Sequence, residues 1–156
     1  MLSETLKLLF NRDLNQLKVE IESYKKESTI WLVEEGIANS AGNLCLHLVG
    51  NLNFFIGTEI GKTGYIRHRD LEFSLKDVPR AELIKKIEDT IPVIDTALDM
   101  ITDEQLETTY PKEVFGHPMS KRYHHPPHLI QKGCHLSLPQ PHLKQYSCQN
   151  CPRCLN

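Results

Sequence analysis

The residue best placed to do chemistry is His47, which lies in the middle of the most apolar segment of the chain, residues 40–57 (SAGNLCLHLVGNLNFFIG). Asn43 and Asn51 lie one helical turn before and after it, on its own side of a helix. A titratable ring on an apolar helix needs a partner, because buried polar groups are hydrogen-bonded. The sequence is compatible with two partners for the His47 ring, an asparagine amide or a metal ion. Cys45 is interpreted as a small core residue, with a metal-facing or nucleophilic thiol as the alternative.

A second group of possible ligands lies near the C-terminus, where Cys148, Cys151 and Cys154 form a CxxCxxC motif. Thiolates at this spacing can share one Zn²⁺ ion or an iron–sulfur cluster. Cys134 or His142 could supply a fourth ligand. The alternative is an accidental pattern, because the motif has no folded context around it.

Residues 58–78 are too irregular for a long helix, and they are either a surface crossover or a binding loop at one end of a bundle. Four polar residues in this segment could bind an acidic group of a substrate or cofactor, although a solvated face is the simpler interpretation. They are Arg67, His68, Arg69 and Asp70. His117 is interpreted as a loop residue.

Three helices are expected to position these residues. Residues 4–26 carry an apolar stripe from Leu6 to Tyr24, which predicts a helix with one buried face. Residues 40–57 follow, and a third stripe runs from Leu83 to Ile101 after Pro79. The expected class is all-α, an up-and-down bundle.

The ends of these helices carry recognisable signals. Ser40 is a suitable N-cap for the second helix and Gly57 a suitable stop, and Asp77 is placed to cap the third. Pro92 falls inside the third stripe, where a kink or a break is expected. In the connections, Trp31 and Leu32 are expected to pack against the bundle, and residues 102–119 are expected to form a loop.

The composition changes abruptly after Ser120. Up to that residue the chain has 13 Lys+Arg and all 20 Asp+Glu, whereas residues 121–156 have five basic residues and no acid. Those 36 residues also hold five of the eight His, four of the five Cys and five of the nine Pro. We therefore treat residues 1–120 and 121–156 as different material.

Composition also narrows the functional classes. A net charge of -2 gives no reason to expect nucleic acid as a partner. No apolar run reaches the length of a membrane span, and the first residues lack the pattern of a signal peptide. The expected location is the cytoplasm.

Four segments together resemble the DinB-like superfamily, and in particular its small bacterial members. They are residues 31–57, GYIRHRDLEFS, the helix after Pro79, and YPKEVFGHPMS, and the resemblance covers about residues 5–120. It implies a four-helix bundle with a divalent metal, Zn²⁺ or Ni²⁺, held by one histidine of the second helix and two of the fourth. His47 occupies the position of the second-helix ligand. Some relatives are thiol-dependent S-transferases, so a small-molecule thiol, a transferase or hydrolase activity and a homodimer are implied.

The chain departs from this resemblance in the fourth helix. The family pattern HxxYHxGQ is absent, and its two histidines would fall near Ile130 and Cys134. His124 and His128 form an HxxxH, but Pro126 and Pro127 lie between them. The fourth helix is therefore uncertain. Residues 121–156 are either a divergent tail or a segment read out of frame, since KRYHHPPHLI can be re-read one base along as KDTIIHLI.

Three functions follow from these patterns. The first is a metal-dependent DinB-like enzyme with His47 as one ligand. The second is a non-catalytic bundle that has lost its metal site and acts in dimerisation or partner binding. The third is a Cys/His metal module in the tail, attached to an inert bundle.

Overall fold

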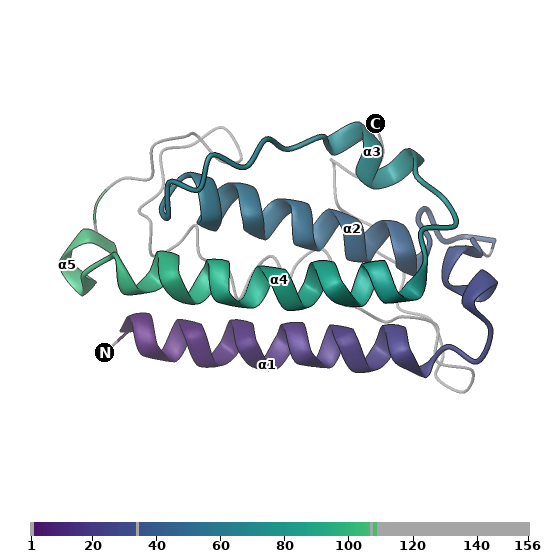
Figure 1. The fold of residues 1–156 in the computed structure, drawn as a ribbon, viewed down its shortest axis with the longest axis horizontal. Coiled ribbons are helices and arrows are strands. Elements are labelled where there is room, and N and C mark those ends of the chain that lie inside the picture. The colour runs from purple at the N-terminus through teal and green to yellow at the C-terminus, as the bar shows by residue number, and fades with distance from the viewer. Residues whose placement is uncertain (1, 34, 107, 109–156) are drawn as a thin grey trace.

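The computed structural model describes residues 2–33, 35–106 and 108, and within them every regular element is helical (Figure 1). The all-α class is thereby confirmed. None of these helices is both long and apolar enough to cross a membrane. The long helices are α1 (Leu2–Ser23), α2 (Ala41–Leu52) and α4 (Arg80–Asp99). The short elements are a 3₁₀ turn η1 (Glu27–Trp31), a π-helical turn η2 (Asn53–Thr58), α3 (Arg69–Ser74) and α5 (Asp103–Leu106).

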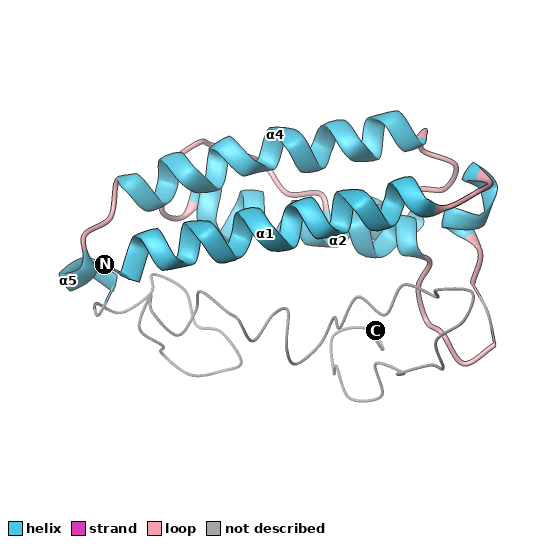
Figure 2. Cartoon of the chain, turned by 90° about the horizontal axis from the view of Figure 1, so that it is seen from below, coloured by secondary structure: helices cyan, strands magenta, loops and turns pink. Residues whose placement is uncertain are grey.

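α1 and α4 lie side by side and run in opposite directions (Figures 1 and 2). Lys7 near the start of α1 pairs with Asp99 at the end of α4, and Lys18 pairs with Glu88. The predicted stripes of both helices face each other in the core. Their buried members are Leu6, Phe10, Leu14, Leu17 and Ile21 of α1, and Leu83, Ile87, Ile94 and Leu98 of α4.

α2 and α4, in contrast, run in the same direction. Asn53 donates to the Thr90 hydroxyl at 2.8 Å, and further along both segments Gly57 lies against Val93. The up-and-down order predicted for the long helices is therefore wrong between α2 and α4. A long crossover, residues 59–79, carries the chain back along α2 before α4 begins (Figure 1). Bundles with parallel neighbours need such a connection.

Several local predictions can be compared with the structure. The Ser40 hydroxyl accepts a hydrogen bond from the backbone N–H of Asn43, so Ser40 is the N-cap of α2 as expected. Gly57 does not stop the helix, which continues as η2 to Thr58. Trp31 is buried as predicted, but Leu32 is 63% exposed, so the prediction for Leu32 was wrong.

α4 begins and continues differently from its prediction. Its N-cap position is Pro79, and Asp77, with φ of +57°, makes no side-chain cap. The helix also continues through Pro92 without a break. Pro92 lines a cavity of about 250 Å³ together with Gly61 and Thr63. The expected loop at 102–119 contains the single turn α5, and its residues 107 and 109–119 lie outside the described part.

Candidate functional site

The crossover places a carboxylate and a guanidinium on His47. His47 Nδ1 lies 2.8 Å from Glu72 Oε2 of α3, and its Nε2 lies 3.0 Å from the Asn51 amide nitrogen. Arg67 binds Glu72 through both ends of its fork, with Nε 2.6 Å from Oε1 and Nη2 2.7 Å from Oε2. The side chains of all three charged or titratable residues are at most 14% exposed. The result is a buried polar cluster on the face of α2 that the crossover covers.

Glu72 is ionised in this cluster. Burial raises the pKa of its carboxyl, but the hydrogen bonds from Arg67 and His47 and the charge of Arg67 outweigh burial and hold the pKa below its ordinary value. A carboxylate can only accept hydrogen bonds. Glu72 therefore accepts from both neighbours, and its negative charge is balanced by the bidentate Arg67.

Arg67 is itself held in place by an aromatic ring. Its guanidinium carbon lies 5.8 Å from the centroid of the Phe55 ring, within the range of a cation–π contact. On the other side of the cluster, the Phe73 ring lies 4.9 Å from the His47 ring, at 40°. An aromatic ring therefore packs on each side of the cluster, which lowers the local dielectric and strengthens its hydrogen bonds.

Gly50 provides the space that Glu72 occupies. A Cβ atom at position 50 would lie 2.2 Å from Glu72 Oε1 and 2.8 Å from its carboxyl carbon. Gly50 follows His47 by three residues, on the same side of α2. The carboxylate thus fits against the bare backbone of the helix next to the imidazole.

Asn43 fixes α3 from the first turn of α2. Its amide nitrogen donates to the backbone carbonyls of Glu72 and Leu75, at 3.0 and 2.9 Å. Its amide oxygen accepts from the Lys76 ammonium at 2.6 Å. The Asn43 amide is therefore not the hydrogen-bond partner of His47, which was one of the predicted alternatives. It secures the backbone that carries Glu72 instead.

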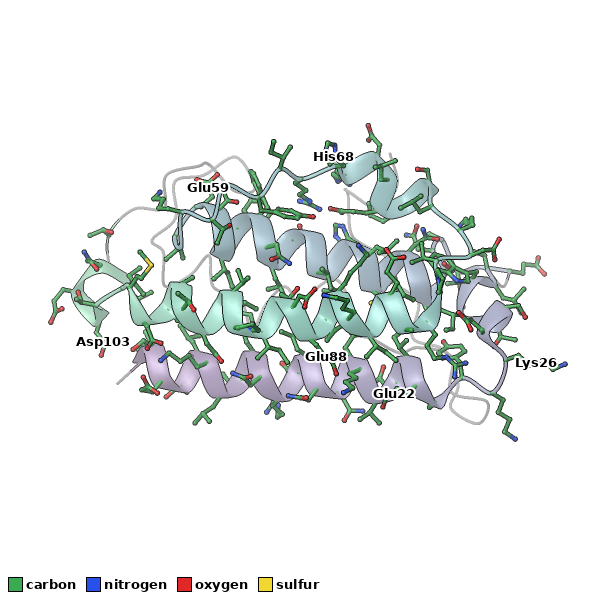
Figure 3. The ribbon with its side chains drawn as sticks, in the orientation of Figure 1. Glu22, Lys26, Glu59, His68, Glu88 and Asp103 are labelled. Carbon is green, nitrogen blue, oxygen red and sulfur yellow. The ribbon has the colours of Figure 1, made fainter. Side chains whose placement is uncertain are left out.

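The structure brings together some of the predicted residues and leaves others apart. Of the two asparagines expected beside His47, Asn51 is its partner. Of the four polar crossover residues, Arg67 reaches the cluster, whereas His68, Arg69 and Asp70 are exposed at the start of α3. Figure 3 shows His68 at this position, at the edge of the molecule. Glu72 was missed by the sequence reasoning, because a glutamate in a charged segment resembles a solvated one.

Cys45 is enclosed in the core, on the side of α2 that packs on α4. It is fully buried, and burial raises the pKa of its thiol to about 12, although the charge of Lys86 acts in the opposite direction. A thiol that keeps its proton at neutral pH is a poor nucleophile. The interpretation of Cys45 as a core residue is supported.

The cluster can be compared with what a metal ion requires. One imidazole nitrogen is fixed by a carboxylate, as is common for histidine ligands of metals. The other, Nε2, is hydrogen-bonded to the neutral amide of Asn51 within the described part of the chain. Among the residues that the structure describes, no group of three or more His, Cys, Asp or Glu is arranged to hold a metal. His47 therefore fits as a single ligand, and this part of the chain supplies no complete site.

Several predicted features lie outside the described residues. They are the fourth helix, the HxxxH of His124 and His128, the CxxCxxC of Cys148, Cys151 and Cys154, the loop residue His117, and the whole segment 121–156 with its two explanations.

Comparison with known families adds one finding. Residues 4–120 match the family described as protein of unknown function DUF1572. The chain belongs to this family. The match includes every residue of the cluster, from Asn43 to Lys76, and its limits agree closely with those of the resemblance noted from the sequence. A search of curated proteins and a search of solved structures each gave no significant match.

Proposed function

We propose that this DUF1572 protein is a divalent-metal-binding protein of the DinB-like type, with His47 as one of its ligands. The observation that carries the proposal is the unequal environment of the two imidazole nitrogens. Nδ1 is held by the buried Glu72, whereas Nε2 faces an amide that a stronger ligand can displace. The resemblance of residues 31–57 to the metal-binding helix of that superfamily supports it.

The remaining ligands in this proposal come from a fourth helix that completes the bundle. The resemblance implies that they would follow residue 120, although the histidine pattern HxxYHxGQ is absent there. Circular dichroism tests this directly: the full chain should contain more helical residues than a chain ending at Ser120. An equal number of helical residues in both would contradict the four-helix bundle.

The proposed chemistry is thiol transfer or hydrolysis. A divalent ion at Nε2, Zn²⁺ or Ni²⁺, would lower the pKa of a small-molecule thiol or of water. The protein's own residues would orient the imidazole through Glu72 and exclude water through the rings of Phe55 and Phe73.

Elemental analysis of the purified full chain tests the metal proposal. We expect stoichiometric metal that is lost in His47→Ala and kept in His68→Ala, which removes an exposed histidine of the crossover. Equal metal in His47→Ala and wild type would refute the role of His47. Metal lost only in Cys151→Ser would instead support the tail module.

A second candidate is a non-catalytic bundle that acts through its surface. It is favoured by apolar side chains on the crossover: Ile66 is 74% exposed, Leu71 49% and Leu75 41%. Exposed apolar groups of this kind can mark an interface. Light scattering with Ile66→Asp, against the matched control Arg69→Asp, tests for a homodimer. A mass unchanged by Ile66→Asp would contradict this interface.

A further inference from the structure

The crossover cluster determines which nitrogen of His47 is available. Glu72 is a carboxylate and cannot donate, so at 2.8 Å the proton between the two groups belongs to Nδ1. Arg67 Nη2 lies 3.2 Å from the same Nδ1, but it is a donor as well, and it donates to Glu72 Oε2 at 2.7 Å. Both donors therefore share one acceptor. A neutral ring with its proton on Nδ1 has its lone pair on Nε2, which accepts from the Asn51 amide.

We propose that Glu72, clamped by Arg67, is a positioning residue that fixes His47 as the Nδ1–H tautomer and so makes Nε2 the metal-binding atom. The metal-binding role of Nε2 rests on the proposed function. The choice of tautomer does not, because it is a property of the protein alone. The role of Arg67 is to hold the carboxylate in one orientation, because its bidentate fork engages both oxygens.

Three features indicate that the arrangement is built for this orientation. Gly50 leaves room for the carboxylate, since a Cβ there would lie 2.2 Å from Oε1. Asn43 holds the backbone of Glu72 in place, because its side-chain amide donates to the Glu72 carbonyl. The Phe73 ring packs beside the imidazole at 4.9 Å and limits its rotation. The Phe73 ring and the Glu72 carboxylate contact the imidazole itself, and a glutamate that only anchored α3 would need neither contact.

The first test is NMR of the full chain labelled with ¹⁵N in histidine, without metal, at pH of about 8.5, where an ordinary imidazole is neutral. His47→Gln assigns the His47 signals by their loss. Long-range ¹H–¹⁵N couplings should identify Nδ1 as the protonated nitrogen in the wild type and in Asn51→Ala, which changes only the partner of Nε2. A proton on Nε2 in the wild type would overturn the proposal without any variant at Glu72.

The second test is the affinity for Zn²⁺ and Ni²⁺ by calorimetry. Glu72→Gln should bind about 10- to 100-fold more weakly, as measured for the partners that orient ligands at other metal sites. Asp70→Asn is the matched control, because it removes an exposed carboxylate of the same helix, and it should bind like the wild type. The double variant Arg67→Met/Glu72→Gln leaves no unpaired buried guanidinium, so it keeps the test valid if Glu72→Gln unfolds.

The outcomes separate the two proposals. If the wild type binds metal through His47 and both Glu72 variants bind it equally well, the positioning role of Glu72 is overturned. The proposed function then still stands. No binding by the wild type refutes the proposed function and the metal-binding role of Nε2, while the couplings still decide which nitrogen of His47 carries the proton.

Discussion

Substitution of Gly50 by alanine tests the packing of the cluster most directly. Two effects oppose each other. Alanine in a helix interior is favoured over glycine by about 1 kcal/mol. However, the new Cβ would lie 2.2 Å from Glu72 Oε1 and 2.8 Å from its carboxyl carbon. The whole carboxylate must move, because both distances are well inside van der Waals contact.

The magnitude follows from what the carboxylate leaves behind. Breaking a buried ion pair costs about 3–5 kcal/mol, because one charge stays buried without its partner. The gain in helix propensity offsets about 1 kcal/mol of this. We therefore expect Gly50→Ala to lower the free energy of unfolding by about 2–4 kcal/mol, measured by urea denaturation at neutral pH.

A double-mutant cycle with Glu72→Ala isolates the cause. Once the glutamate is truncated, the added methyl group at position 50 meets no carboxylate. Gly50→Ala should then cost little, or stabilise the protein by up to about 1 kcal/mol through helix propensity. An equal cost of Gly50→Ala in both backgrounds would refute the reasoning and assign the effect to another contact of α2.

Three further predictions follow from the same contacts. Asn43→Ala leaves the buried Glu72 carbonyl and the partly buried Leu75 carbonyl without their donor. It should cost about 1–3 kcal/mol in urea denaturation, as for one unsatisfied buried polar group, whereas Asn15→Ala, on the exposed face of α1, should cost less than about 0.5 kcal/mol; equal costs would contradict the role of Asn43. Because the pKa of Glu72 is lowered in the folded state, its stabilisation is complete above the unfolded pKa of about 4.3 and is lost as the pH falls through the folded pKa. The stability difference between wild type and Glu72→Gln should therefore shrink between pH 7 and pH of about 3, and a constant difference would contradict the shift. The Cys45 thiol, with its pKa raised to about 12, should resist iodoacetamide until the protein is unfolded, in a chain whose other four cysteines are serine; rapid labelling of the native protein would contradict its burial.

The sequence predicted the helices well, because each carries a periodic signal. The stripes of α1 and α4 are amphipathic, and Ser40 supplies a side-chain cap for α2. The direction of α2 relative to α4 was not predictable from such signals. It depends on where the crossover ends, and a connection of some twenty residues is long enough to return to either end of a helix.

The candidate site was predicted only in part. His47 stood out because an imidazole is costly on an apolar helix. Its main partner, Glu72, did not, because its burial depends on tertiary contacts that no local pattern encodes. One signal was available in the sequence: Gly50 lies one turn from His47 on the same face, in the second half of α2, where all the other residues are larger. A glycine there indicates the close approach of another group.

The spacing of polar residues in α2 explains why that helix is buried on more than one side. Asn43, His47 and Asn51 are separated by four residues each, so they form a polar stripe along one face. Asn43 binds the backbone of the crossover, His47 binds Glu72, and the Asn51 amide is hydrogen-bonded to Nε2 of the imidazole. The opposite face, with Cys45, packs in the apolar core. An apolar stripe alone would leave the crossover without specific partners, whereas this stripe fixes it in one register, and it is this register that brings a carboxylate to a single histidine.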